Sequence, residues 1–354
     1  MQLYDTARRA VVGFVPGRTA TIYVCGITPY DATHIGHAFT FVTYDVLARR
    51  LVDRGHPVRY VRNVTDVDDP LFEKARQLGV DARDLAAREE ARFEADMAAL
   101  SVRAPCAAPH VSTGIADIQA CIARLVEAGH AYVVAGSVYG DVGRFSRFGE
   151  VSGLDGETML TLARERGGKV DDPNKRHPLD FVLWHPSAVD EPCWASAWGP
   201  GRPGWHVECS AFALRDLGSP IDLHGGGSDL IFPHHECECA IAEAVAGQPF
   251  VKHWMHVAMV WKDGHKMSKS LGNLVFVDLL RACHDPRAIR LALLAHHYRT
   301  EWSWEDAELP RAEARLRAWS NAATGGGDSA EVLEAVRAAL DDDLDTPAAL
   351  AALD

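Results

Sequence analysis

The chain has 354 residues, of which 47% are hydrophobic, and a formal net charge of −13. This length and apolar content allow a large core and predict two or three domains. The first residues lack a basic stretch followed by an apolar segment, and no apolar run approaches membrane-spanning length. We therefore expect a soluble cytoplasmic protein rather than a secreted or membrane protein. Eight scattered cysteines favour free thiols or metal ligands over disulfides, and the acidic balance disfavours a large nucleic-acid-binding surface.

Predicted strands and helices alternate through the first third of the chain. We expect strands at residues 21–25 and 58–64, helices at residues 35–54 and 81–102, and a further helix beginning at residues 68–70. This alternation predicts an α/β fold with a Rossmann-like, doubly wound parallel sheet. Ligands of such sheets bind at the carboxyl ends of the strands, where Cys25 and residues 63–65 fall.

The pattern changes near residue 131. The later elements that we expect are a hairpin at residues 131–142, resumption of the parallel sheet at 180–185, a helix at 204–217, a strand at 221–224, a glycine turn at 225–227 that approaches a nucleotide, a helix from 232, helices after 281, a linker at 324–328 and a last helix capped by Asp345.

These changes divide the chain into five predicted regions. They are the N-terminal half of a nucleotide-binding catalytic domain (residues 1–130), a connective insertion (131–179), the C-terminal half of the catalytic domain with a metal site (180–260), a lysine-containing loop with a helical stem (261–323) and a short acidic helical region (324–354).

Two motifs predict the binding of ATP phosphates. His34 and His37 stand one turn apart at a predicted helix start, where unpaired N–H groups and a partial positive charge stabilise an anion. Taken alone, this pair fits equally well a helix start whose histidines bond to backbone groups. Far downstream, Lys266 and Lys269 lie in the run Lys-Met-Ser-Lys-Ser, where they can hold a leaving pyrophosphate. Both motifs in this order predict the adenylation of a carboxylate.

Two thiols, an imidazole and a carboxylate form a candidate metal site. His234 and Glu238 are four residues apart at a predicted helix start, so their side chains share one face. Cys209 lies in the preceding helix, and Cys25 ends the first predicted strand. This donor set suits Zn²⁺, and three protein ligands leave a position for an incoming donor. Considered singly, each cysteine also fits a buried, inert thiol.

Residues 25–28, 34–37, 201–209, 225–236 and 266–270 resemble cysteinyl-tRNA synthetases, and the resemblance spans nearly the whole chain. It implies class I adenylation chemistry and one zinc ion per chain, held by Cys25, Cys209 and His234 with Glu238 near or weakly on the metal. It also implies that the sulfur of the substrate binds this zinc. Because a thiolate is a better zinc ligand than a serine hydroxyl, such a metal selects cysteine without a proofreading site.

The resemblance further implies a role for each of the other motifs. His34, His37, Lys266 and Lys269 would be catalytic, and Mg²⁺ is expected with the substrate ATP. The residues implied to surround cysteinyl adenylate are Cys25, Gly26, Ile27, Thr28, Thr40, Asn63, Val64, Thr65, Trp205, Gly227, Ser228, Asp229 and Val260. Asp229 would accept the ribose hydroxyls, and Trp205 would form an apolar wall beside the metal, although a core tryptophan is an equal alternative.

Other segments are more similar to the mycothiol-pathway ligases, which join cysteine to the amino group of glucosaminyl-inositol. Residues 25–34, 37–39, 66–73 and 158–168 carry this likeness. Residues 328–354 hold eight acidic groups against one arginine, a net −7 that disfavours contact with a phosphate backbone, and we expect no anticodon-reading module after them. Two features favour the synthetases instead. Glu238 is a ligand that the ligases generally lack, and Lys169-Val170 replaces their Asp-Pro.

We therefore predict a cytoplasmic, monomeric, ATP-dependent ligase of mycothiol biosynthesis with no membrane partner. It would form cysteinyl-AMP from L-cysteine and ATP and transfer the cysteine to glucosaminyl-inositol. The alternatives are a cysteinyl-tRNA synthetase, with tRNA as the acceptor, and a binding paralogue without catalysis. The intact phosphate motifs and metal ligands count against the second alternative.

Overall fold

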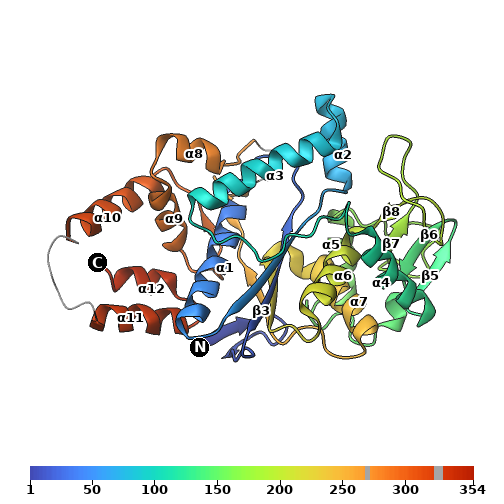
Figure 1. The fold of residues 1–354 in the computed structure, drawn as a ribbon, viewed down its shortest axis with the longest axis horizontal. Coiled ribbons are helices and arrows are strands. Elements are labelled where there is room, and N and C mark those ends of the chain that lie inside the picture. Colours follow the sequence, from blue (N-terminus) through green and yellow to red (C-terminus); the bar gives the residue numbers. More distant parts are fainter. Residues whose placement is uncertain (268–271, 323–329) are drawn as a thin grey trace.

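The central layer of the molecule is a sheet of four parallel strands (Figure 1). The structure, a computed structural model, describes residues 1–267, 272–322 and 330–354. The strands of this sheet are β3 (Ala20–Ile27), β4 (Val58–Val64), β9 (Leu223–Gly227) and β10 (Trp254–Val257). They lie in the order β10-β9-β3-β4, and every neighbouring pair is parallel. The predicted doubly wound parallel sheet is confirmed.

Alternate residues of β3 enter two separate cores, one on each face of the sheet. Ile22 and Val24 pack in one core with α1, whereas Tyr23 and Cys25 pack in the other with α6 and α7. These helices are α1 (Ile35–Asp53), α6 (Trp205–Leu217) and α7 (Glu236–Ala246). Successive side chains of a strand point to opposite faces, so burial on both faces explains the continuous apolar run of β3. The same alternation directs Cys25 toward α6 and α7.

Three helices follow β4 and precede the insertion. They are α2 (Asp69–Leu78), α3 (Ala82–Ala99) and α4 (Ile115–Glu127). Asp68 caps α2 by accepting a hydrogen bond from the backbone N–H of Asp69, and Asp81 caps α3 by accepting from those of Arg83 and Asp84. Such caps satisfy N–H groups that have no partner within the helix. The helix starts predicted at these two aspartates are confirmed.

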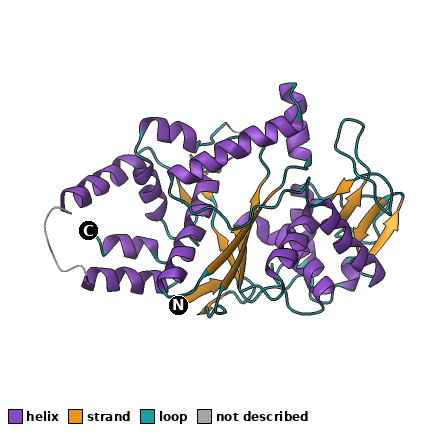
Figure 2. Cartoon of the chain, viewed as in Figure 1, coloured by secondary structure: helices purple, strands orange, loops and turns teal. Residues whose placement is uncertain are grey.

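The insertion and the residues up to 203 form an antiparallel sheet at the end of the molecule opposite the C-terminal helices (Figures 1 and 2). Its strands are β5 (Ala131–Val134), β6 (Ser137–Gly140), β7 (Phe181–His185) and β8 (Arg202–Pro203), and it also carries the short helix η1 (Val142–Arg144) and α5 (Gly156–Glu165). The predicted hairpin is confirmed. The expectation that residues 180–185 resume the parallel sheet is wrong, because β7 pairs antiparallel with β6. Periodicity identifies a strand but not its partner.

The glycine run at residues 225–227 is strand rather than turn, which corrects a second expectation. These residues complete β9, whose neighbours are β3 and β10. A Cβ atom on Gly225 would lie 2.0 Å from the hydroxyl of Tyr44 and 2.1 Å from the carbonyl oxygen of Met255. Close packing against α1 and β10 therefore requires glycine at this position. The turn comes afterwards, in η2 (Ser228–Leu230) and the π-helical η3 (Ile231–His235).

The remaining elements form a small sheet, a terminal hairpin and a group of helices. They are β1 (Gln2–Asp5), β2 (Ala10–Gly13), β11 (Val260–Lys262), β12 (His265–Lys266), β13 (Trp302–Ser303), α8 (Val277–Cys283), α9 (Pro286–Leu294), α10 (Glu308–Ala322), α11 (Ala330–Asp341) and α12 (Thr346–Ala351). Asp345 caps α12 as predicted. The predicted linker at residues 324–328 and the lysine loop from residue 268 to 270 lie outside the described residues. Within the described ranges, every helix is too short or too polar to cross a membrane.

Candidate active site

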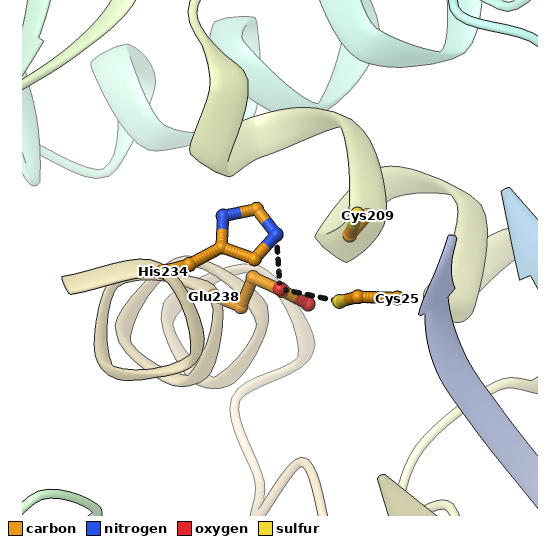
Figure 3. Close-up of side chains that lie close together, drawn as sticks. All are labelled: Cys25, Cys209, His234 and Glu238. Carbon is orange, nitrogen blue, oxygen red and sulfur yellow. Dashed lines mark hydrogen bonds and ion pairs between the residues drawn. The ribbon is translucent and has the colours of Figure 1, made fainter. Parts of the chain in front are cut away.

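Four buried side chains converge beyond the carboxyl end of β3 (Figure 3). Cys25 comes from β3, Cys209 from α6, His234 from η3 and Glu238 from α7, and their ligand atoms all lie within 4.8 Å of one another. His234 Nε2 lies 2.8 Å from Glu238 Oε1, to which the Cys25 thiol donates at 3.1 Å. The structure thus brings together all four residues singled out as candidate metal ligands, although they come from four different elements.

The pKa values of the cluster are shifted by burial and by the close approach of two thiols and a carboxylate to the His234 imidazole. Burial raises the pKa of the Cys25 thiol well above its ordinary value. Burial disfavours the charged form of His234, but the Glu238 carboxylate and Cys209 outweigh it and raise the pKa of His234 to about 10. A donor set of two thiols, an imidazole and a carboxylate in a buried position has the composition that Zn²⁺ prefers.

The two histidines of the N-terminal motif lie at the start of α1. His34 caps the helix, because its Nδ1 accepts a hydrogen bond of 3.1 Å from the backbone N–H of Gly36. The rings of His34 and His37 stack with centroids 3.9 Å apart. The structure therefore combines the two alternatives for this pair: His34 bonds to the backbone, and both rings remain at the helix N-terminus.

The segment after the lysine loop is hydrogen-bonded to the start of α1. The N–H of Ile35 donates to the carbonyl of Val275 at 2.9 Å, and the N–H of Val277 donates to the carbonyl of Thr33 at 2.9 Å. The chain that follows the loop thus lies beside the histidine pair. Lys266 ends β12, while Lys269 lies outside the described residues. The position of either lysine side chain stays a prediction.

Most residues implied to surround an adenylate gather where the parallel strands end. Six of them end the strands: Cys25, Gly26 and Ile27 in β3, Asn63 and Val64 in β4, and Gly227 in β9. Four more follow directly: Thr28 after β3, Thr65 after β4, and Ser228 and Asp229 in η2. The other three lie at the start of β11 (Val260), at the start of α6 (Trp205) and in the second turn of α1 (Thr40). The Asn63 side chain accepts from the backbone N–H of Gly26 at 2.9 Å and so joins two of these strand ends. This edge is where doubly wound folds bind nucleotides.

Comparison with known proteins identifies the group to which the chain is related. A family model described as tRNA synthetases class I (C) catalytic domain matches residues 13–314. An L-cysteine:1D-myo-inositol 2-amino-2-deoxy-α-D-glucopyranoside ligase of Nocardiopsis dassonvillei is 52% identical over all of this chain and 88% of its own length. The chain belongs to this ligase family.

Further comparisons agree with this assignment. A ligase of the same name from Mycolicibacterium smegmatis is 51% identical, again over the whole chain and 88% of its own length. The Mycobacterium tuberculosis methionyl-tRNA synthetase, solved in complex with methionyl-adenylate, superposes with a TM-score of 0.67 at 18% identity, covering 94% of this chain and 81% of that one. The latter likeness shows the class I synthetase fold in this chain.

A second group of buried histidines, which sequence reasoning missed, adjoins the four-residue cluster. His224 Nε2 lies 2.8 Å from Glu238 Oε2, and His235 Nε2 lies 3.2 Å from the Cys25 sulfur. Cys25, His224 and His235 form an alternative set of close ligand atoms. His235 also approaches His256, with 2.7 Å between ring nitrogens. His235 lies in the 225–236 run that carries the resemblance, and His224 lies in a predicted strand, but neither was given a role, because single histidines are common in cores.

Trp205 and Glu208, both in α6, border the cluster on its other side. The Trp205 ring stacks on His234 at 4.1 Å between centroids, in keeping with the expected wall beside the metal ligands. The Thr65 hydroxyl donates to Glu208 at 2.6 Å, and burial raises the pKa of the Glu208 carboxyl well above its ordinary value. Sequence reasoning gave Glu208 no role, although it lies in the 201–209 run that carries the resemblance.

Two of the acidic residues that the structure describes near the end of the chain pair with arginines from elsewhere in the chain. Both oxygens of Asp341 bond to Arg50, and Arg54 adds a further ion pair. Asp343 pairs with Arg299 at 2.5 Å. These arginines offset part of the negative charge of residues 328–354.

Proposed function

We propose that this enzyme activates L-cysteine with ATP to form cysteinyl-AMP and transfers the cysteine to the amino group of glucosaminyl-inositol. The observation that carries the choice of cysteine is the buried Cys25–Cys209–His234–Glu238 cluster, which lies beyond the strand ends of a class I fold. The choice of acceptor is supported by the relatives that share about half of their residues with the whole chain. We place this reaction in mycothiol biosynthesis, in the cytoplasm, and propose that the chain acts as a monomer.

Zinc is the ion that we propose for the cluster. Cys25, Cys209 and His234 would hold it, and the carboxylate of Glu238 is close enough to join them. Bound zinc would supply a position that prefers a thiolate to a hydroxyl, which separates cysteine from serine. The remaining oxygen of Glu238 bonds to His224, which fixes the orientation of the carboxylate.

Cysteine activation would take place between the cluster and the start of α1. With its sulfur at the cluster, the substrate would have its carboxylate toward the histidine pair at the start of α1. His34 and His37, at the positive end of a helix, would stabilise the α-phosphate as its charge grows, and Lys266 and Lys269 would stabilise the departing pyrophosphate with Mg²⁺. The protein contributes chiefly positioning and electrostatic stabilisation in such reactions.

A cysteinyl-tRNA synthetase remains the second candidate because Glu238 completes a synthetase-like ligand set. The decisive experiment offers the purified enzyme ATP, L-cysteine and either glucosaminyl-inositol or tRNA, and measures acceptor-dependent AMP release at low and raised salt. We expect release with the aminosugar and little salt dependence, since this acceptor has no phosphate backbone. Charging of tRNA without turnover of the aminosugar would reverse the assignment.

A further inference from the structure

Asp68 lies beside the segment that joins the metal-ligand cluster to the histidine pair. This segment runs from the end of β3, at Cys25 to Ile27, to the cap of α1 at His34. The Thr28 hydroxyl within it donates to Asp68 Oδ2 at 3.3 Å, while Asp68 Oδ1 accepts the N–H of Asp69 at the start of α2. One carboxylate oxygen thus caps a helix, and the other is bonded to the segment along which we propose that the substrate binds.

The groups around Asp68 favour a carboxylate that can take up a proton. Arg202 of β8 lies close enough to act on Asp68, but it already pairs with Asp69 and Glu191. Glu208 of α6 is close enough to feel the charges of both Asp68 and Asp66. Burial, with a smaller effect of the Asp69 charge, raises the pKa of Asp68 to about 6. A base with a pKa near the working pH transfers protons most effectively.

Transfer of cysteine to an amine requires a group that removes a proton from the amine, which adenylation does not. An aliphatic amine arrives as an ammonium ion, which has no free electron pair and cannot attack a carbonyl. Glu238 is engaged in the cluster, and Glu208 is fully buried and bonded to Thr65. Asp68 is only partly buried, so an acceptor entering from solvent can reach it.

We propose that Asp68 is the general base that deprotonates the amino group of the acceptor. This inference rests on the proposed function. The ammonium gives one proton to Asp68 Oδ2, and the freed electron pair forms a C–N bond with the carbonyl carbon of cysteinyl-AMP. The bond from that carbon to the phosphate oxygen breaks, and AMP leaves with the electron pair. The second surplus proton on nitrogen passes to solvent, as does the proton on Asp68, and an amide remains.

The test replaces Asp68 with asparagine, which keeps the helix cap and the size of the side chain but removes the base. We expect cysteine-dependent pyrophosphate exchange to stay within about twofold of the parent enzyme, and AMP release with glucosaminyl-inositol to fall by about 10²-fold or more. In the parent enzyme this second rate should drop as pH falls through about 6, because Asp68 must be ionised, and Asp68→Asn should lose that limb.

Two controls separate a base from a structural role. Asp81→Asn alters the corresponding cap of α3, away from Thr28, and should leave both rates unchanged. Hydroxylamine is uncharged at neutral pH and needs no base, so Asp68→Asn should still convert cysteinyl-AMP to the hydroxamate at the parental rate.

Each failure has its own meaning. If the parent enzyme exchanges pyrophosphate and uses the aminosugar while Asp68→Asn transfers cysteine equally well, the role of Asp68 is wrong and the proposed function stands. Equal loss of exchange, hydroxamate formation and transfer in Asp68→Asn would also overturn that role, because it would indicate a structural function. If the parent enzyme lacks cysteine-dependent exchange, the proposed function itself fails.

Discussion

The sulfur of Cys25 lies 3.1 Å from Oε1 of Glu238, although 213 positions separate the two residues in the chain. Strand alternation turns Cys25 toward α7, and the i,i+4 spacing of His234 and Glu238 places both on the side of the helix that faces it. The contact therefore depends on two regular elements rather than on loops. Such sites are held more rigidly than loop-borne ones.

Metal content provides the first prediction. We expect the parent enzyme to contain about one zinc ion per chain, and Cys209→Ala to lose most of it together with cysteine-dependent pyrophosphate exchange, because a thiolate ligand is removed. Elemental analysis of purified proteins measures the first effect. Cys239→Ala is the matched control, since Cys239 is a buried thiol of α7 outside the cluster. An undiminished zinc content in Cys209→Ala would show that the cluster does not bind the zinc.

The sequence was sufficient for features that depend on local pattern. Apolar runs and caps predicted β3, β4 and the starts of α2 and α12, and the i,i+4 spacing paired His234 with Glu238. The hydrophobic pattern of a segment predicts which side chains are buried and to which face they point. At the carboxyl edge of a parallel sheet, these two properties largely determine which residues meet. The four members of the cluster could therefore be predicted from the sequence.

Features that depend on the partner of an element could not be predicted. Nothing local to β7 states that it pairs with β6, and Gly225 is explained only by the Tyr44 hydroxyl, which comes from a distant helix. The same limit applies to His235, which lies against Cys25, and to Asp341, which pairs with Arg50 of α1. Each of these roles is set by a neighbour that is remote in the sequence.

Lysine substitutions test the proposed phosphate loop. We expect Lys269→Ala to lower the rate of pyrophosphate exchange by about 10²-fold with little change in cysteine binding, because its charge would act on phosphates that become more negative in the transition state. Lys262→Ala, in the adjacent strand β11, removes a lysine that pairs with Asp306 and should leave exchange intact. Unchanged exchange in Lys269→Ala would exclude this role for the loop.

Gly225→Ala tests the packing assigned to the glycine run. The added methyl group would overlap the Tyr44 hydroxyl and the Met255 carbonyl, so we expect a loss of about 1–3 kcal/mol in the free energy of unfolding. Gly13→Ala is the control, since no atom lies within 4 Å of its Cβ position. Urea unfolding of the three proteins provides the comparison. Equal stability of Gly225→Ala and the parent would mean that β9 can move to accommodate the methyl group and that the close packing does not require glycine.

The last prediction concerns the attachment of α11 to α1 and its dependence on pH. Burial opposes ionisation of Asp341, but bonds to Arg50 and the charge of Arg54 outweigh it and hold the pKa of Asp341 below its ordinary value. A lowered pKa in the folded state means that this pair stabilises the fold above the unfolded pKa of about 4 and that the contribution disappears as pH falls through the folded value.

Asp341→Asn should therefore lower the free energy of unfolding by about 1–3 kcal/mol at neutral pH, because Arg50 is nearly buried, and by progressively less in acid. Asp342→Asn, at the exposed neighbouring position, should cost almost nothing. Urea unfolding across this pH range gives the measurement, and a cost that persists at the acid end would show that the ion pair is not its cause.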